Sequence, residues 1–268
     1  MRALYIVGPT GSGKSSLASL IAKSLNAEIV NADAFQLYKR IDVITAAPNS
    51  NELSRAPHHL YGVLDLDQES NAGKYSSLAK DKIKEIQNNK KLPIVTGGSG
   101  LYIKSLTHGL LDLPPVDETL RQDLEKLSIE ELVQKLIKID PEGALNMNLK
   151  NKRYVIRALE ISIQCGQPMS QIKNAWKQKT TSFNGLIIER PREELYQRID
   201  SRVIEMFNCG AVEEIKALPK NLSETAKKAI GIGEIQKYLN GEISLEESIS
   251  TIQKHSRNYA KRQITWFK

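Results

Sequence analysis

Two kinds of hydrophobic pattern alternate along the chain. Short apolar runs at residues 4–7, 28–31, 94–96 and 186–189 predict buried strands. Apolar residues recur at helical spacing in residues 16–25 and 193–218, and the pattern Ser244 to Glu247 predicts a capping box that starts a further helix. Strands separated by helical stretches indicate an α/β fold with a parallel sheet.

The pattern changes between the third and fourth apolar runs. Leu113-Pro114-Pro115 interrupts the chain, residues 119–172 are helical in spacing, and Asp140-Pro141-Glu142 predicts a helix start. We therefore predict a core made of residues 1–115 and 184–268. An all-helical insertion domain is predicted at residues 116–183.

Composition narrows the class of protein. The 268 residues are 40% hydrophobic, which excludes a disordered chain, and no apolar stretch reaches the length of a transmembrane helix. Residues 1–7 lack the length and cleavage site of a signal peptide, so we expect no membrane association. Cys165 and Cys209 have no CxxC spacing, which argues against zinc and favours a reducing cytoplasm. We expect both cysteines to be buried as small apolar residues.

The net charge of +7 is concentrated in two segments. Residues 145–179 hold seven basic residues and one acid, and residues 251–268 hold five basic residues and no acid. This distribution suits a nucleic-acid surface. A solvated lysine-rich surface explains it equally well, so charge alone leaves both interpretations open.

A phosphate-binding motif follows the first predicted strand. It matches G-x-x-x-x-G-K-[ST] at every fixed position, and it consists of Gly8, Pro9, Thr10, Gly11, Ser12, Gly13, Lys14 and Ser15. Its backbone N–H groups and the following helix N-terminus favour a polyanion. Lys14 would contact the terminal phosphate, and the Ser15 hydroxyl would bind Mg²⁺. The motif specifies a polyphosphate, not ATP in particular.

Two further segments follow predicted strands and should reach the same sheet edge. Asp33, after the second strand, could accept a proton or hold Mg²⁺, but it could equally cap a helix. Ser99 lies in Gly97-Gly98-Ser99-Gly100, which is either a ligand-binding turn or a plain strand-to-helix turn. The absence of an acid at the end of the 94–96 strand argues against an ordinary ATPase. The segments Gly97-Gly98-Ser99-Gly100-Leu101-Tyr102 and residues 260–266 argue against a small-molecule kinase.

Seven ordered blocks of the chain resemble the tRNA dimethylallyltransferase family. These are the phosphate loop, residues 33–48, Pro57-His58-His59-Leu60, residues 92–101, Arg157-Ala158-Leu159-Glu160, residues 198–210 and Ala260-Lys261-Arg262-Gln263-Ile264-Thr265-Trp266-Phe267. The resemblance spans essentially the whole chain. It implies a P-loop NTPase-like core and transfer of a dimethylallyl group from dimethylallyl diphosphate to N6 of the tRNA adenosine 3′ of the anticodon, with Mg²⁺ as cofactor.

The resemblance also implies roles for single residues. Asp33 would accept the N6 proton, while Lys14 and Arg202 would stabilise the leaving pyrophosphate. Contacts to the tRNA anticodon arm are expected from Asp33, Ala34, Phe35, Gln36, Ser99, Arg121, Arg153, Tyr154, Arg157, Lys228, Gly231 and Gly233. We expect a monomer.

Some positions depart from the family pattern. Ala34 replaces a serine, Ile44 and Ala47 replace a glycine and a lysine, and Tyr154 stands where an arginine is expected. These changes fall on elements expected to face tRNA, which leaves two alternatives: an adenylate-type dimethylallyltransferase, or an RNA-binding protein with impaired transferase activity.

Overall fold

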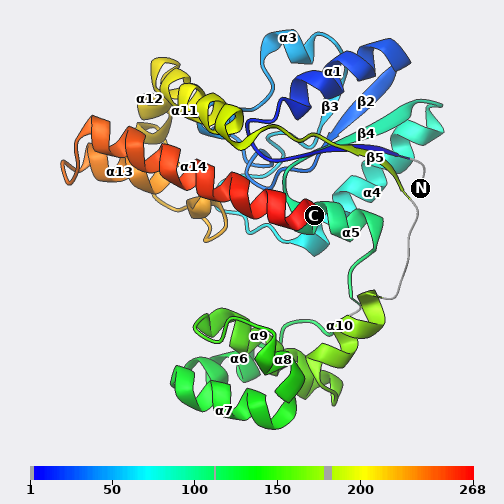
Figure 1. Cartoon of the computed structure of the whole chain (residues 1–268), viewed down its shortest axis with the longest axis vertical. Coiled ribbons are helices and arrows are strands. Elements are labelled where there is room, and N and C mark those ends of the chain that lie inside the picture. The colour runs from blue at the N-terminus through cyan, green and yellow to red at the C-terminus, as the bar shows by residue number, and fades with distance from the viewer. Residues whose placement is uncertain (1–2, 112, 178–182) are drawn as a thin grey trace. The chain divides into compact units, whose positions relative to one another are not determined.

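The computed structural model describes residues 3–111, 113–177 and 183–268. Contacts divide the chain into two compact units, Met1–Thr107 with Ser182–Lys268, and His108–Thr181. The sequence placed the limits of the insertion at residues 116 and 183. Figure 1 shows the helices and strands of both units.

The larger unit is built on a parallel five-stranded sheet in the order β3-β2-β4-β1-β5. Its strands are β1 (Leu4–Val7), β2 (Ala27–Asn31), β3 (His58–His59), β4 (Leu92–Gly97) and β5 (Asn184–Ile187). The predicted α/β class with a parallel sheet is confirmed. Four strands were predicted, whereas β3 was not.

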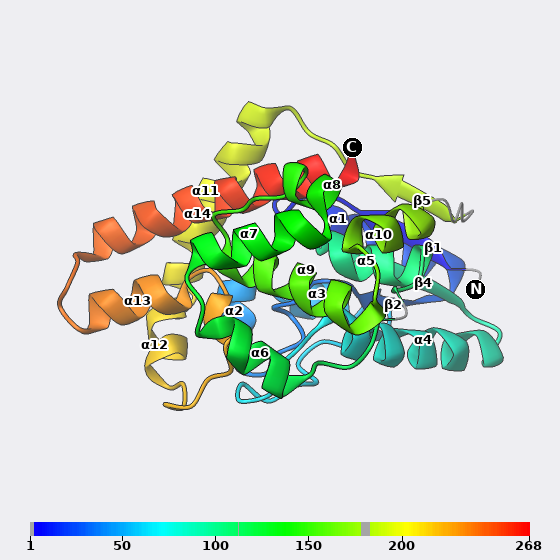
Figure 2. The ribbon, with the colours of Figure 1, turned by 90° about the horizontal axis from the view of Figure 1, so that it is seen from below.

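Helices cover both faces of this sheet (Figures 1 and 2). Alternate strand residues explain the two layers: Ile6, Ile29 and Ile94 pack with α1, while Val30 and Val95 pack with α4 and α5. Before the smaller unit come α1 (Lys14–Leu25), α2 (Asp42–Thr45), α3 (Ser50–Leu53), α4 (Ala72–Asn88) and α5 (Gly100–Thr107).

The C-terminal part of the larger unit is helical. It comprises α11 (Arg192–Asn208), α12 (Ala211–Lys216), the 3₁₀ helix η1 (Ala226–Lys228), α13 (Ile232–Leu239) and α14 (Leu245–Phe267). The stretch predicted as helical from 193 to 218 is split, because Gly210 has a φ of 92° and caps α12. The predicted capping box at Ser244 and Glu247 is present at the start of α14.

The regular structure of the smaller unit is all helical within its described residues. It contains α6 (Glu118–Glu125), α7 (Ile129–Ile139), α8 (Pro141–Leu145), α9 (Lys152–Cys165) and α10 (Met169–Lys177). Leu132, Leu136, Val155 and Leu159 form its core. The buried carboxylate of Asp140 joins three segments, because it accepts from Gly143 N at 2.8 Å and from Ser170 N at 2.8 Å.

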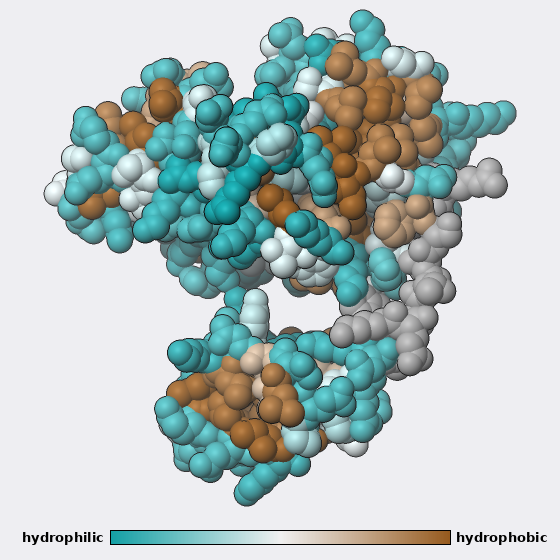
Figure 3. Space-filling model, viewed as in Figure 1, coloured by the Kyte–Doolittle hydropathy of each residue, from teal (hydrophilic) through white to brown (hydrophobic). Residues whose placement is uncertain are grey.

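Two surface features complete the fold. Apolar side chains gather over α1 and β5 (Figure 3), the elements that carry the exposed residues Leu20, Leu25, Leu186 and Ile187. The burial predicted for the cysteines was wrong for Cys209, which is exposed at the C-terminus of α11, while Cys165 is half-buried. None of the described helices has the length and apolar character needed to cross a membrane.

Candidate active site

The phosphate loop joins β1 to α1 in the predicted manner. Gly13 has a φ of 90°, a left-handed conformation that suits glycine, and α1 begins at Lys14. The Lys14 ammonium folds back to donate to the Pro9 carbonyl at 3.3 Å. Burial lowers the pKa of Lys14 to about 8, the nearby Asp33 carboxylate opposes that shift, and Arg202 adds to it. An anion bound in the loop would therefore stabilise the charged form of Lys14.

Arginines from the chain after β5 surround the same loop. Arg202 on α11 donates to the Thr10 hydroxyl, and Arg198 donates to the Gly11 carbonyl at 2.9 Å. Arg190 donates to the Ser12 carbonyl at 2.7 Å. Burial lowers the pKa of the half-buried Arg202.

Arg202 thus lies at the phosphate loop, where the sequence placed it. Arg190 and Arg198 were not predicted as site residues. Arg198 lies one turn before Arg202 on the same helix, which was the available signal. Arg190 precedes α11, and nothing in its local sequence indicates the contact.

Asp33 lies at the carboxyl end of β2. Its backbone N–H donates to Asn31 Oδ1 at 2.7 Å, and its Oδ1 accepts from Phe35 N at 3.1 Å. Residues 34–37 form turns, and the next helix starts at Asp42, so the helix-cap interpretation of Asp33 was wrong. Its charge acts on both Lys14 and Arg202. The structure thus brings together the three residues predicted to be catalytic.

Ser99 lies beside Asp33 after β4. Its hydroxyl accepts from Ala34 N at 2.9 Å, and Ser99 N donates to the Ala32 carbonyl at 3.1 Å. The two loops are therefore locked together at the sheet edge. Phe35 faces the ring of Tyr259 on α14 at 6.4 Å between centroids, whereas Gln36 donates its amide to the carbonyls of Thr45 and Ala46 at 2.9 Å.

Two arginines predicted to contact tRNA are held by a buried acid in the smaller unit. Arg121 donates to both carboxylate oxygens of Glu160 at 2.6 and 2.9 Å, and Arg157 donates at 3.1 Å. Glu160 is fully buried, while about a third of each arginine side chain is exposed. The hydrogen bond that Arg121 donates to Glu160 raises the pKa of Arg121. Arg153 and Tyr154 lie one turn earlier on α9 and are exposed.

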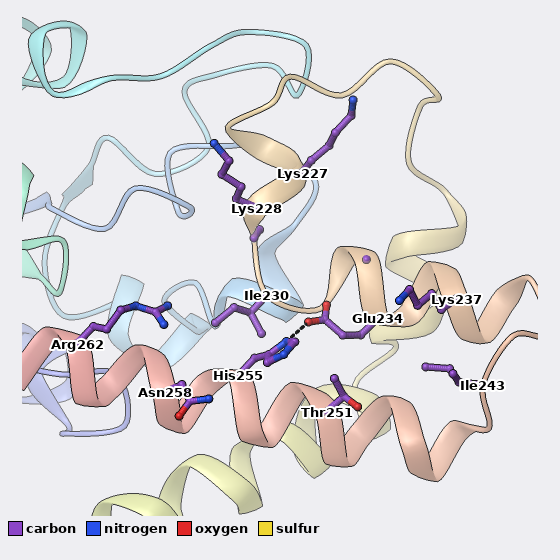
Figure 4. A pocket seen from close by; sticks show the side chains of 12 residues that line it. Lys227, Lys228, Ile230, Glu234, Lys237, Ile243, Thr251, His255, Asn258 and Arg262 are labelled. Atoms are coloured by element: carbon purple, nitrogen blue, oxygen red, sulfur yellow. Dashed lines mark hydrogen bonds and ion pairs between the residues drawn. The ribbon is translucent and has the colours of Figure 1, made fainter. Parts of the chain in front are cut away.

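The third group of predicted tRNA contacts lines a groove of about 480 Å³ between η1, α13 and α14 (Figure 4). Lys228 and Gly233 line it from one side, whereas Gly231 is buried behind them. His255 on α14 bonds Glu234 at 2.6 Å, and the other oxygen of Glu234 accepts from Gly231 N at 2.9 Å. The groove is also lined by Lys227, Lys237 and His255, which the sequence did not predict as contacts, and by Arg262 from the basic segment 251–268.

Comparison with known proteins agrees with this geometry. The family model described as IPP transferase matches residues 36–268. The tRNA dimethylallyltransferase 1 of Citrifermentans bemidjiense is 40% identical over 272 residues, covering 100% of this chain and 89% of that protein. The tRNA dimethylallyltransferase of Akkermansia muciniphila is 42% identical over 265 residues, covering 99% and 90%. The chain belongs to the IPP transferase family.

Solved structures of related enzymes support the family assignment. A tRNA isopentenylpyrophosphate transferase of Staphylococcus epidermidis aligns with a TM-score of 0.70 at 32% identity, covering 100% of this chain and 90% of that one. A eukaryotic dimethylallyltransferase described as acting on tRNA aligns with a TM-score of 0.87 at 30% identity, covering 100% and 70%. The family predicted from the sequence blocks and its P-loop-like fold are confirmed.

The family model begins at residue 36, just beyond the phosphate loop and Asp33. These residues are covered by the full-length alignments with the relatives. Arg202, Arg121 and Arg157 lie inside the matched range. The residues around the phosphate loop thus come from both sequence segments of the larger unit, with Lys14 in the first and Arg202 in the second.

The described part of the chain does not build a resident metal site. Within residues 3–111, 113–177 and 183–268, no three His, Cys, Asp or Glu side chains are grouped so that they could hold a metal. The Ser15 hydroxyl, next to Lys14, is a suitable but single ligand. Mg²⁺ commonly retains water and binds substrate phosphates with few protein ligands, so these residues fit an ion that arrives with a diphosphate.

Proposed function

We propose that this protein transfers a dimethylallyl group from dimethylallyl diphosphate to N6 of the tRNA adenosine that follows the anticodon. One observation carries the proposal: Asp33 lies at the same sheet edge as a phosphate loop whose cations, Lys14 and Arg202, both respond to its charge. A diphosphate held in the loop and an amine deprotonated by Asp33 would meet at this edge.

The reaction forms a bond between adenine N6 and C1 of the dimethylallyl group, and it breaks the bond from C1 to the bridging oxygen. The electron pair leaves with pyrophosphate, and the N6 proton goes to the Asp33 carboxylate. Lys14, Arg202 and the loop N–H groups stabilise the negative charge that develops on the leaving group. The Ser15 hydroxyl would hold Mg²⁺ beside the diphosphate, and the bound ion would supply further charge neutralisation.

The arrangement around Asp33 suits a base that must stay oriented. Asn31 and the Phe35 N–H fix its backbone and one carboxylate oxygen. Ser99 is tied to Ala34, next in sequence, so the turn cannot rotate freely. The target adenine has to leave its stack to reach this edge, and a loop lowers the cost of that step relative to a duplex.

The remaining predicted contacts supply the tRNA surface. Arg153 and Tyr154 on α9 and Lys228 beside the groove of Figure 4 are exposed and suit phosphate contacts. Arg121 and Arg157 contribute through the exposed part of guanidinium groups that Glu160 holds in place. Of the other basic residues of the 145–179 segment, Lys179 and the side chain of Lys177 lie outside the described residues.

A paired transfer assay tests the function. The full chain is incubated with Mg²⁺, labelled dimethylallyl diphosphate and either unmodified tRNA or AMP. We expect label on the tRNA adenosine and a loss of about 10²–10⁴-fold in Asp33→Asn, because the general base is removed while the shape is kept. The control Asp81→Asn changes an exposed acid on α4 and should transfer normally.

The other outcomes separate the alternatives. Label on AMP rather than tRNA would identify an adenylate-type enzyme. Binding of tRNA without transfer to either acceptor would indicate that Ala34, Ile44 and Ala47 have impaired the enzyme. Equal rates in Asp33→Asn and the unchanged protein would contradict the role of Asp33.

A further inference from the structure

One buried side chain joins the loop that follows β1 to the loop that follows β4. Gln263 on α14 is 4% exposed. Its Oε1 accepts from Thr10 N in the phosphate loop at 2.7 Å, and its Nε2 donates to the Gly98 carbonyl at 2.9 Å. Both hydrogen-bonding ends of the amide are used, each on the backbone of a different loop.

The loop after β4 has no room for side chains where α14 meets it. A Cβ on Gly98 would lie 2.1 Å from the Nε2 of Gln263, and a Cβ on Gly100 would lie 2.5 Å from the ring of Trp266. Trp266 follows Gln263 by three residues, so one face of α14 makes both contacts. The close approach of α14 therefore depends on glycine at both positions.

The same face of α14 reaches Asp33 through Ser99. Tyr259, one turn before Gln263, lies close to the side chains of Ser99 and Gln263, and both oppose the rise that burial causes in the pKa of its hydroxyl. The Ser99 hydroxyl also accepts from Ala34 N at 2.9 Å, next to Asp33. Hydrogen bonds thus join Thr10 N to Gly98 through Gln263, and Tyr259 lies beside both Gln263 and Ser99, whose hydroxyl holds the backbone next to Asp33.

We propose that Gln263 is a positioning residue that fixes the phosphate loop relative to Asp33, and so aligns the diphosphate donor with the acceptor amine. This inference rests on the proposed function. The phosphate loop would hold the donor, and the loop after β2 carries Asp33. Gln263 joins the phosphate loop to the loop after β4, and Ser99 joins that loop to the one after β2. Since a misplacement of about 1 Å can cost about 100-fold in rate, a fixed spacing has a direct effect on the transfer step.

The first test replaces the amide with an apolar side chain of similar length. Gln263→Met should lower the single-turnover rate of transfer by about 30–100-fold, because the loops lose their common partner. The KM values for dimethylallyl diphosphate and tRNA should change by less than about threefold, since the groups that bind each substrate remain.

A matched control lies on the same helix. Gln253 donates its amide to the Asp200 carbonyl on α11 at 3.2 Å, so Gln253→Met also removes an amide contact between α14 and another element. Its transfer rate should stay within about twofold of the unchanged protein. Melting temperatures of both variants show whether a loss of rate follows a general loss of stability.

A milder variant tests the same path if Gln263→Met folds poorly. Tyr259→Phe removes one hydroxyl, and we expect a three- to tenfold lower single-turnover rate. Combined with Gln263→Met, the loss should be smaller than the product of the two single losses, because both act on one path.

Several outcomes would overturn the inference. They are a Gln263→Met variant with the rate of Gln253→Met, a loss confined to the KM for one substrate, and multiplicative losses in the double variant. Failure of the proposed function gives a different result, because the unchanged protein would then transfer no label to tRNA, and the inference would fall with it.

Discussion

The phosphate loop and the smaller helical unit both hold arginines, but they hold them in opposite ways. At the loop, Arg198 and Arg202 donate to uncharged oxygens, the Gly11 carbonyl and the Thr10 hydroxyl. In the smaller unit, Arg121 and Arg157 share the buried carboxylate of Glu160. The charge of Arg198 and Arg202 is therefore left for a ligand, whereas that of Arg121 and Arg157 is paired with the Glu160 carboxylate.

The pKa directions express the same difference. Burial lowers the pKa values of Lys14 and Arg202, so their charged forms are strained at the loop. The hydrogen bond with Glu160 raises the pKa of Arg121, so its charged form is stabilised there. A cation whose pKa is lowered in the ligand-free protein gains most when an anion binds beside it. The comparison therefore favours the loop over the Glu160 cluster as the place where an anion would bind.

The largest effect is expected from Lys14→Met. The charge that faces the leaving group is lost, and transfer should fall about 10²–10³-fold. Folding stability should not fall, because a buried charge is replaced by an apolar side chain of similar length. Single-turnover transfer and thermal unfolding measure the two effects.

Lys23→Met, on the exposed last turn of the same helix, is the matched control and should leave both quantities unchanged. A transfer rate in Lys14→Met close to that of this control would show that the strained cation has no part in the reaction.

The sequence predicts the phosphate loop itself better than the distant residues that contact it. The phosphate loop is a local motif, so Lys14 and its strand–loop–helix context follow directly from residue spacing. Arg190 and Gln263 reach the loop from distant segments, across 178 and 253 positions, and no local pattern records such contacts. β3 was missed for a similar reason, because its two histidines form a strand only by pairing with Ile29 and Val30.

The smaller unit shows where sequence interpretation of charge is limited. Arg157 and Glu160 are three residues apart on a helix, a spacing that predicts an ion pair. Arg121 lies 39 positions from Glu160, and its bidentate contact depends on how α6 packs against α9. A basic segment can therefore contain arginines that already form ion pairs within the protein.

The variant Glu160→Gln tests whether the ion pairs of Glu160 stabilise the smaller unit. A neutral amide loses the charge-assisted bonds to Arg121 and Arg157, and we expect local stability of the smaller unit to fall by about 2 kcal/mol. This is equivalent to about 30-fold faster opening of α9 in hydrogen exchange. The arginines are partly exposed, so water limits the cost.

Glu130→Gln changes an exposed acid on α7 and is the control for this measurement. Diphosphate binding by the larger unit should be the same in both variants. A weakened phosphate loop in Glu160→Gln would show that the two charge centres are coupled, contrary to the comparison.

The pH dependence of kcat/KM for dimethylallyl diphosphate should reflect the lowered pKa of Lys14. Because burial lowers the pKa of Lys14 to about 8, kcat/KM for dimethylallyl diphosphate should fall up to tenfold per unit as pH rises above about 8. At saturating donor the fall should begin at higher pH, since a bound anion favours the ammonium form. A kcat/KM that stays constant up to pH 9.5 would contradict a lowered pKa for Lys14.

Folding stability should change in the opposite sense over the same range. Between about pH 8 and the ordinary lysine pKa of about 10.5, the unfolded chain keeps a proton that folded Lys14 has released. The contribution of Lys14 to the free energy of unfolding therefore rises with pH across this window. Lys14→Met should lack that contribution when the two proteins are compared by urea unfolding at pH 7.5 and 9.5.

The smallest effects are expected at exposed cations that neither region uses internally. Arg153→Ala on α9 and Lys228→Ala beside the groove should each weaken tRNA binding about two- to fivefold, because one phosphate contact is lost. The slope of log K against log salt should become shallower by about 0.7–0.9 per variant. Lys84→Ala, which removes an exposed charge from α4, should leave the slope unchanged. An unaltered slope in Arg153→Ala and Lys228→Ala would remove these cations from the tRNA surface, and the arginines held by Glu160 would then be its main candidates in the smaller unit.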